Sequence, residues 1–170
     1  MSNNKFSKIS SIIQDAKKGK MFILVDDKNR ENEGDLIIPG SKCDSRSINF
    51  MAKHGRGLIC LALTKKQIDI LKLPLMSPNN KSRMQTAFTI SIEAKKGVTT
   101  GISAHDRAKT IKTAINPKVR KNDIVSPGPV FRFTPLRISL PSIATCRSFI
   151  SNTAIFQIIL ILYIIPTKFS

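Results

Sequence analysis

The ten residues from Asp26 to Asp35 contain many side chains that could bind a ligand or transfer a proton. They read D-D-K-N-R-E-N-E-G-D and hold five of the chain's 11 acids, in a protein whose formal net charge is +17. Carboxylates packed this closely repel one another, and a bound divalent cation relieves that repulsion. Arg30 adds a guanidinium that binds phosphate or hydroxyl oxygens. The carboxylates of Glu31, Glu33 and Asp35 could exchange protons. The segment is predicted to bind a cation or a polyhydroxylated ligand.

A solvated turn would explain the acids of this segment equally well on composition alone. An EF-hand loop is a poor match, because it would need a glycine where Asn32 stands. Two details favour a ligand site: Arg30 lies among the acids, and Gly34 lets the backbone turn tightly or approach a ligand closely.

The elements beside this segment follow from hydrophobic patterning. The apolar run Met21–Val25 predicts a buried strand before it, and Leu36–Ile38 predicts a second strand after it, ended by Pro39 and Gly40. Apolar residues at helical spacing predict a first helix over about residues 7–18, with Gly19 at its C-terminal end. The acidic segment is thus expected to connect two strands.

Further along the chain, short helices and strands alternate. Asp44, Thr64 and Ser103 are predicted helix N-caps, the last with Asp106 at capping-box spacing. The run 58–63 predicts a buried strand and 86–92 a half-buried one. This mixture predicts an α+β (mixed α/β) fold, with a single-domain mixed sheet flanked by helices.

Composition limits the partners. The basic residues are scattered, with few aromatic residues beside them, so a lysine-rich surface is favoured over a nucleic-acid-binding protein, which stays a remote alternative. Three cysteines without a C-x-x-C pair argue against structural zinc and a disulfide framework. The N-terminus lacks the apolar core of a signal peptide. We expect a cytoplasmic protein with no membrane partner.

Other candidate residues are weaker. His54 and Arg56 in H-G-R-G fit a basic helix end better than an anion site. Cys60 falls within an apolar strand, where a buried inert thiol is the default. The segment 97–101, G-V-T-T-G, could bind phosphate through hydroxyl and backbone N–H groups. His105 and Asp106 are interpreted as a helix first turn and not as a catalytic pair.

Four strings together resemble 3,4-dihydroxy-2-butanone 4-phosphate synthase, an enzyme family of riboflavin biosynthesis. They are F-I-L-V-D-D-K-N-R-E-N-E-G-D-L, I-N-F-M-A-K-H-G-R-G-L-I-C, T-A-F-T-I-S-I-E-A and G-V-T-T-G-I-S-A-H-D-R-A-K-T-I. The resemblance covers about residues 21–128, and R-E-N-E-G-D together with H-G-R-G-L-I-C is highly specific.

The resemblance implies a lyase that converts D-ribulose 5-phosphate into 3,4-dihydroxy-2-butanone 4-phosphate and formate with Mg²⁺ or Mn²⁺. By that resemblance Arg30, Glu31 and Asp35 contact the substrate, and Glu31 binds the metal. Glu33, Asp35 and Cys60 match catalytic positions, Cys60 as a cysteine that lines the active site. Family members are homodimers, so a homodimer is expected here.

The chain departs from the family after Gly128. Where the family has a catalytic histidine in P-G-H, this chain has Pro129, and no His or Glu follows Phe131. The family's R-x-G-H-T-E-A string, with its second metal-binding histidine, does not occur in the sequence. These departures leave a second interpretation open, namely a catalytically inactive, truncated or frameshifted remnant of the enzyme.

The same departures predict two parts of the chain. Residues 1–131 are expected to form a truncated synthase-like domain without the family's C-terminal elements, and residues 132–170 an atypical apolar tail. The tail contains neither acid nor glycine. A shift of reading frame shortly after Gly128 would produce such a composition.

Overall fold

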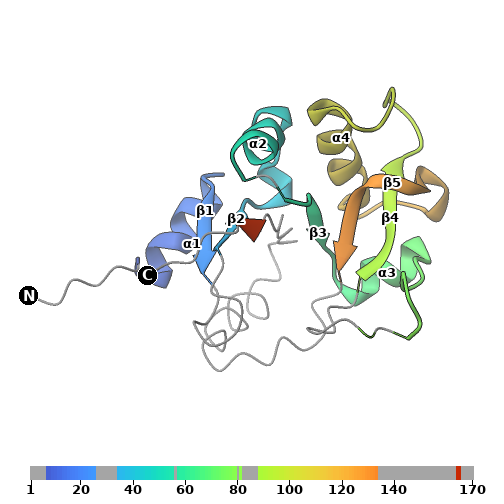
Figure 1. Cartoon of the computed structure of the whole chain (residues 1–170), viewed down its shortest axis with the longest axis horizontal. Helices are drawn as coiled ribbons and strands as arrows, with labels where there is room; N and C mark the ends of the chain where they lie inside the picture. The colour runs from blue at the N-terminus through green and yellow to red at the C-terminus, as the bar shows by residue number, and fades with distance from the viewer. Residues whose placement is uncertain are drawn as a thin grey trace, which may run out of the picture.

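The computed structural model describes residues 7–25, 34–55, 57–79, 81, 88–133 and 164–165. Figure 1 shows two groups of strands side by side, with α2 and α4 lying on the same side of the molecule. The four α-helices are α1 (Ile9–Lys17), α2 (Ser45–Phe50), α3 (Lys65–Leu71) and α4 (Ala104–Ala114). Two 3-10 turns, Gly40–Lys42 (η1) and Lys121–Asp123 (η3), and one π-helical turn, Met51–Gly55 (η2), accompany them.

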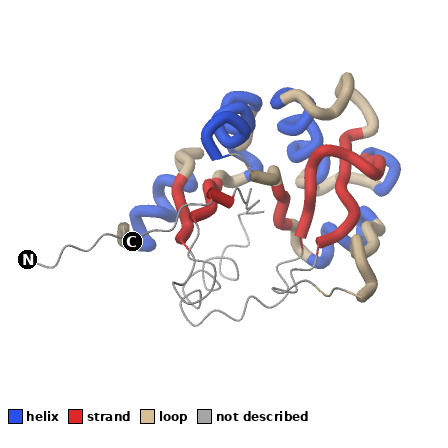
Figure 2. The backbone as a smooth tube through the Cα atoms, viewed as in Figure 1, coloured by secondary structure: helices blue, strands red, loops and turns tan. Residues whose placement is uncertain are grey.

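The described strands form two three-stranded sheets (Figure 2). The first has the order β1-β2-β6, all antiparallel, from β1 (Phe22–Val25), β2 (Gly34–Ile37) and β6 (Ile164–Ile165). The second has the order β3-β5-β4, from β3 (Cys60–Ala62), β4 (Phe88–Ala94) and β5 (Ile124–Phe133). β5 runs parallel to β3 and antiparallel to β4. The predicted α+β fold is confirmed, with its strands divided between two sheets.

The predicted helix caps are present. The Asp44 carboxylate accepts a hydrogen bond from the Ser47 N–H at 2.8 Å, and the Thr64 hydroxyl accepts one from the Gln67 N–H at 3.3 Å. Gly19, just past α1, has the left-handed φ of +79° that glycine adopts without strain. Each cap supplies a partner that the first or last turn of a helix lacks, so local sequence alone fixed these ends.

The two faces of the β3-β5-β4 sheet carry different side chains. Leu61, Ile92 and Val130 are buried in the main core, together with Ile111 of α4. Their strand neighbours turn to the opposite face, where Cys60 and Ala62 pack with Phe88 and Phe131. The helix α4 therefore covers one face, and Cys60 belongs to the other.

The strand β5 was not predicted from the sequence. Its residues Pro127, Gly128 and Pro129 have the composition of a turn, and the register against β4 is irregular at this point. Gly128 approaches β4 so closely that a Cβ there would overlap the backbone of Ile92 and lie 2.5 Å from Glu93 N. Pairing with two neighbouring strands therefore overrides the local turn signal.

Within the part of the chain that the structure describes, none of the helices is both long and apolar enough to span a membrane.

Candidate functional site

The predicted site residues divide between described and undescribed segments. Arg30, Glu31 and Glu33 lie outside the residues that the structure describes. Asp35 lies in β2 and Cys60 in β3. The geometry of the site is therefore built from these two residues and the strands that hold them.

Asp35 lies in the middle strand of the first sheet. Its backbone is paired with Leu24 of β1 on one side and with Ile164 of β6 on the other. The side chain is half-buried, while its neighbours Gly34 and Leu36 are buried. Pairing on both sides fixes the position at which the acid-rich segment re-enters the sheet.

Cys60 is a buried thiol whose pKa is raised by burial and by the charge of Asp35. Burial raises the pKa of Cys60 to about 12, and the nearby negative charge of Asp35 adds to the rise. The structure therefore brings these two predicted residues together, although they belong to different sheets. A thiol in this environment stays protonated at neutral pH.

Position 129 lies in β5, two residues before the register partner of Cys60. That partner is Phe131, whose N–H donates to the Ile59 carbonyl at 3.1 Å. Pro129 falls between the paired residues Val125 and Val130, where the register of β5 against β4 is irregular. The residue at this position is a proline, which cannot exchange a proton.

The segment 97–101 was a weak candidate for phosphate binding, and three of its donors already have a partner. One oxygen of the buried Asp106 carboxylate accepts hydrogen bonds from the Thr99 N–H at 3.2 Å, the Thr99 hydroxyl at 2.8 Å and the Gly101 N–H at 3.1 Å. The Thr99 hydroxyl is the main group that holds the pKa of Asp106 below its usual value, against the opposing effect of burial. The Asp106 carboxylate thus accepts the hydrogen bonds that an external anion would have accepted from Thr99 and Gly101.

Asp106 was missed as an organising residue. The sequence marked it only as part of a helix cap, and the Ser103 hydroxyl does accept its N–H at 3.0 Å. Its carboxylate also lies 3.6 Å from the exposed ring of His105, measured between Oδ1 and Nδ1. One sequence signal could have indicated this role of Asp106. The string T-T-G, which offers a hydroxyl and a glycine N–H, stands a few residues before an aspartate in the first turn of a helix.

The other weak candidates contribute little to this site. His54 packs its ring against Phe50, with 4.6 Å between the ring centroids, at the surface of η2. Arg56 lies outside the described residues.

The described residues do not form a metal centre. Among them, no group of three or more His, Cys, Asp or Glu side chains is placed to hold an ion. Carboxylate oxygens are the ligands that Mg²⁺ and Mn²⁺ prefer, and the acids of residues 26–33 are of that type. Glu31, the ligand implied by the resemblance, lies in that undescribed segment.

Taken together, the fold and the site define a small α+β domain in which an acid-rich segment enters a sheet beside a buried thiol. The model of the 3,4-dihydroxy-2-butanone 4-phosphate synthase family matches residues 10–139. The chain belongs to this family.

Similar proteins support this assignment. The 3,4-dihydroxy-2-butanone 4-phosphate synthase of Pseudomonas syringae pv. tomato is 52% identical over 132 residues, covering 78% of this chain and 35% of that protein. A crystal structure of RibBX, a two-domain synthase from A. baumannii, has a TM-score of 0.82 at 35% identity, covering 94% of this chain and 48% of that one. A synthase crystallised in complex with two magnesium ions has a TM-score of 0.75 at 38% identity, covering 77% and 61%. The chain thus spans about a third of the length of the P. syringae relative.

Proposed function

We propose that this chain carries the activity of its family, the conversion of D-ribulose 5-phosphate into 3,4-dihydroxy-2-butanone 4-phosphate and formate in riboflavin biosynthesis. The observation that carries the proposal is the match of the synthase family model to residues 10–139. This range contains the R-E-N-E-G-D segment and the H-G-R-G-L-I-C string, the two strings most specific to the family.

Each site residue has a proposed role in this reaction. Arg30 and Asp35 bind the sugar phosphate, and Glu33 moves a proton at a substrate carbon. Glu31 holds Mg²⁺ or Mn²⁺, which when bound supplies positive charge beside the oxygens of the sugar.

Cys60 has a passive role in this proposal. Because the pKa of Cys60 is raised to about 12, the thiol does not compete with Glu33 for the substrate proton. The thiol excludes water from one wall, and an uncharged wall strengthens the interactions of the neighbouring carboxylate.

The residue at position 129 favours a second candidate function, a relative that keeps the fold without the turnover. The family's catalytic histidine would stand at this position, and here it is a proline. In this case the chain would bind the sugar phosphate through the acid-rich segment without releasing formate.

Formate release from ribulose 5-phosphate with Mg²⁺ distinguishes the two candidates. Turnover that is abolished by Glu33→Gln and by a chelator supports the lyase, and the absence of formate at high enzyme concentration overturns it. The variant Pro129→His tests whether this position alone separates the two candidates. Because the family's second metal-binding histidine is also absent from the sequence, the second candidate predicts that this variant still releases no formate. Formate release by Pro129→His, where the parent chain releases none, would identify position 129 as the one missing element.

A cytoplasmic homodimer is also proposed, by analogy with the family. Apolar side chains that are about half exposed, such as Ile23, Leu75 and Met76, are compatible with a covered surface in an assembly. Light scattering on the purified chain tests the dimer, and a mass equal to one chain at micromolar concentration would refute it.

A further inference from the structure

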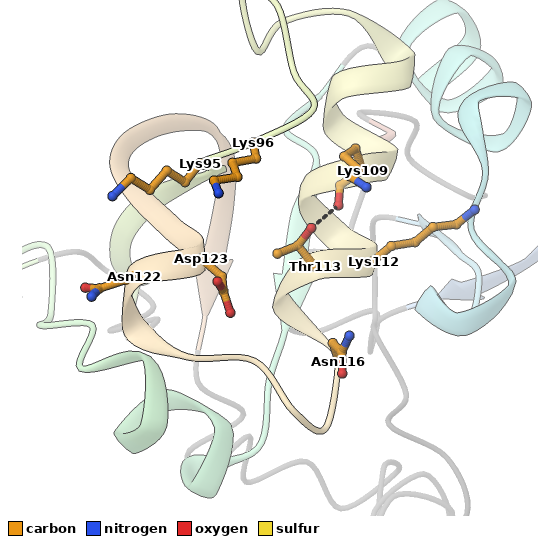
Figure 3. Close-up of a pocket in the computed structure, with 8 residues that line it drawn as sticks. All are labelled: Lys95, Lys96, Lys109, Lys112, Thr113, Asn116, Asn122 and Asp123. Atoms are coloured by element: carbon orange, nitrogen blue, oxygen red, sulfur yellow. Dashed lines mark hydrogen bonds between the residues drawn. The ribbon is translucent and has the colours of Figure 1, made fainter.

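A basic pocket lies at the end of α4, between that helix and the start of β5. Its cavity volume is about 410 Å³. Four lysines and one carboxylate line it, together with a hydroxyl and two amide side chains, as drawn in Figure 3: Lys95, Lys96, Lys109, Lys112, Thr113, Asn116, Asn122 and Asp123. Figure 3 shows Lys95 and Lys96 on the segment facing α4, with Lys109 across from them and Lys112 extending away. Lysines therefore make up half of the residues that line the pocket.

The walls of the pocket are held in place by buried or backbone hydrogen bonds. The Lys95 N–H donates to the Asp123 carbonyl at 2.9 Å, which ties the end of β4 to η3. The buried Gln67 amide donates to the carbonyls of Ala114 at 2.8 Å and Asn116 at 3.1 Å, which fixes the end of α4. A ligand would meet a preformed cavity and would not have to order it.

Several polar groups around the pocket already have partners within the chain. The Asp123 carboxylate accepts from the Arg120 N–H at 2.8 Å, and the Asn116 side-chain oxygen accepts from the Lys118 N–H at 2.9 Å. The Thr113 hydroxyl donates to the Lys109 carbonyl at 2.9 Å. The lysine ammonium groups, which are donors only, outnumber the one carboxylate that lines the pocket.

Lys109 is positioned by the glycine opposite. Gly97 has a φ of +75°, and a Cβ there would lie 3.1 Å from Lys109 Cε and 3.7 Å from its Nζ. The absence of a side chain at Gly97 lets Lys109 lie across the turn that also carries Lys95 and Lys96. Lysine side chains from two separate segments thus line one pocket.

The pocket is distinct from the candidate active site. It is built on α4, whose Ala108 and Ile111 pack with Ile92 and Val130 on one face of the β3-β5-β4 sheet. Cys60 lies with Phe131 on the other face. The sheet therefore separates the lysines from the wall to which the substrate is assigned.

We propose that this pocket is a second, separate binding site, and that it takes a small polyanion bearing two or more linked phosphate groups. Several lysines in one hollow neutralise several charges at once, which suits linked phosphates better than a single carboxylate. The cavity is of the size that encloses a small molecule.

The lining favours a small phosphate compound over nucleic acid. None of the eight lining residues is aromatic, so the pocket offers no stacking platform for a base. Recognition rests on the phosphate groups alone, and inorganic tripolyphosphate is therefore a suitable probe.

Isothermal titration calorimetry of the full chain with tripolyphosphate at low salt tests the proposal. We expect one binding site per chain. In the triple variant Lys95→Gln, Lys96→Gln and Lys109→Gln, the affinity should fall by about tenfold or more, since three exposed charge pairs are lost. A matched control, Lys17→Gln, Lys18→Gln and Lys66→Gln, removes the same charge from exposed positions on α1 and α3 and should change the affinity less than threefold.

Three results would overturn the proposal. Equal losses in the triple variant and its control would mean attraction by net charge alone. Displacement of tripolyphosphate by ribulose 5-phosphate would assign the lysines to the substrate site. Tighter binding of a single-stranded oligonucleotide, lost in the triple variant but not in the control, would make the pocket a nucleic-acid site. The single variant Lys109→Gln, with an unchanged circular dichroism melt, separates lost binding from lost folding.

Discussion

The replacement Gly128→Ala tests how tightly β5 is held against β4 at the bulge. A Cβ at position 128 would overlap the carbonyl group of Ile92 and lie 2.5 Å from Glu93 N. Ordinary van der Waals contact begins near 3.4 Å. The two strands would have to separate locally by about 1 Å, because backbone atoms cannot rotate away as a flexible side chain can.

The expected loss combines strain with two hydrogen bonds. The Gly128 N–H donates to the Ser91 hydroxyl at 3.2 Å, and the Ser126 hydroxyl donates to the Ser91 carbonyl at 2.6 Å. Overpacking costs about 1–3 kcal/mol, and each weakened hydrogen bond about 1 kcal/mol. The free energy of unfolding should therefore fall by about 3–5 kcal/mol, which lowers the Tm by about 6–20 °C in a chain of this size.

Thermal denaturation followed by circular dichroism measures this change. The control Ser126→Ala removes one of the two hydrogen bonds without the overlap, so its free energy of unfolding should fall by only about 1 kcal/mol. If Gly128→Ala melts within error of the parent chain, or no lower than Ser126→Ala, then the close approach of β5 to β4 does not exist as described.

Three further predictions concern buried polar groups. The folded-state pKa of Asp106 is lower than its unfolded value, so its contribution to stability is present above about pH 4 and is lost as the pH falls through the folded pKa. In urea melts at a series of pH values, Asp106→Asn should therefore lose less stability on acidification than the parent, and an unchanged acid profile contradicts this. Gln67→Ala removes the buried amide that donates to the Ala114 and Asn116 carbonyls, of which Asn116 keeps the Val119 N–H; it should cost about 2 kcal/mol in the same melts, with an unaltered midpoint as the contrary result. Cys60, with its pKa raised to about 12, should resist iodoacetamide in the folded chain at pH 8 and react on unfolding. Asp35→Asn should change that little, because burial is the larger cause, and rapid alkylation of the folded parent would refute the description of the thiol.

Helix ends were predictable from the sequence because their causes are local. Asp44, Thr64 and Ser103 each cap a helix that starts at the next residue, through bonds to an N–H three residues on. Gly19 adopts the left-handed backbone expected at a helix end. In each case the residue and its partner lie within one turn, so the pattern contains the whole interaction.

The features that the sequence did not reveal depend on segments far apart in the chain. β5 forms because β3 and β4 pair with it, although Pro127 and Pro129 suggest a turn. The 97–101 segment has the letters of an anion site, but the Asp106 carboxylate satisfies its donors. The basic pocket joins three segments, and scattered lysines gave no sign of it.

The candidate site was predictable in part, because its residues lie in strings that resemble a known family. Two family strings pointed to Asp35 and Cys60. That the Asp35 carboxylate lies near enough to raise the pKa of the Cys60 thiol, although the two belong to different sheets, followed only from the structure. The roles of Arg30, Glu31 and Glu33 stay predictions, since these residues lie outside the described segments. The division of the chain at residue 131 also stays a prediction.

The register of β5 bears on how this protein could change in evolution. The described pairing with β3 begins at Cys60 and Phe131, so position 129 lies just beyond the end of that ladder. Proline lacks an N–H, and its cost in a strand arises where that N–H would have been paired. The backbone can therefore accept proline or histidine at this point without rearranging the sheet. Replacing a proton-transferring side chain at position 129 by proline therefore leaves the sheet unchanged. Restoring such a side chain would require no second substitution elsewhere in the fold.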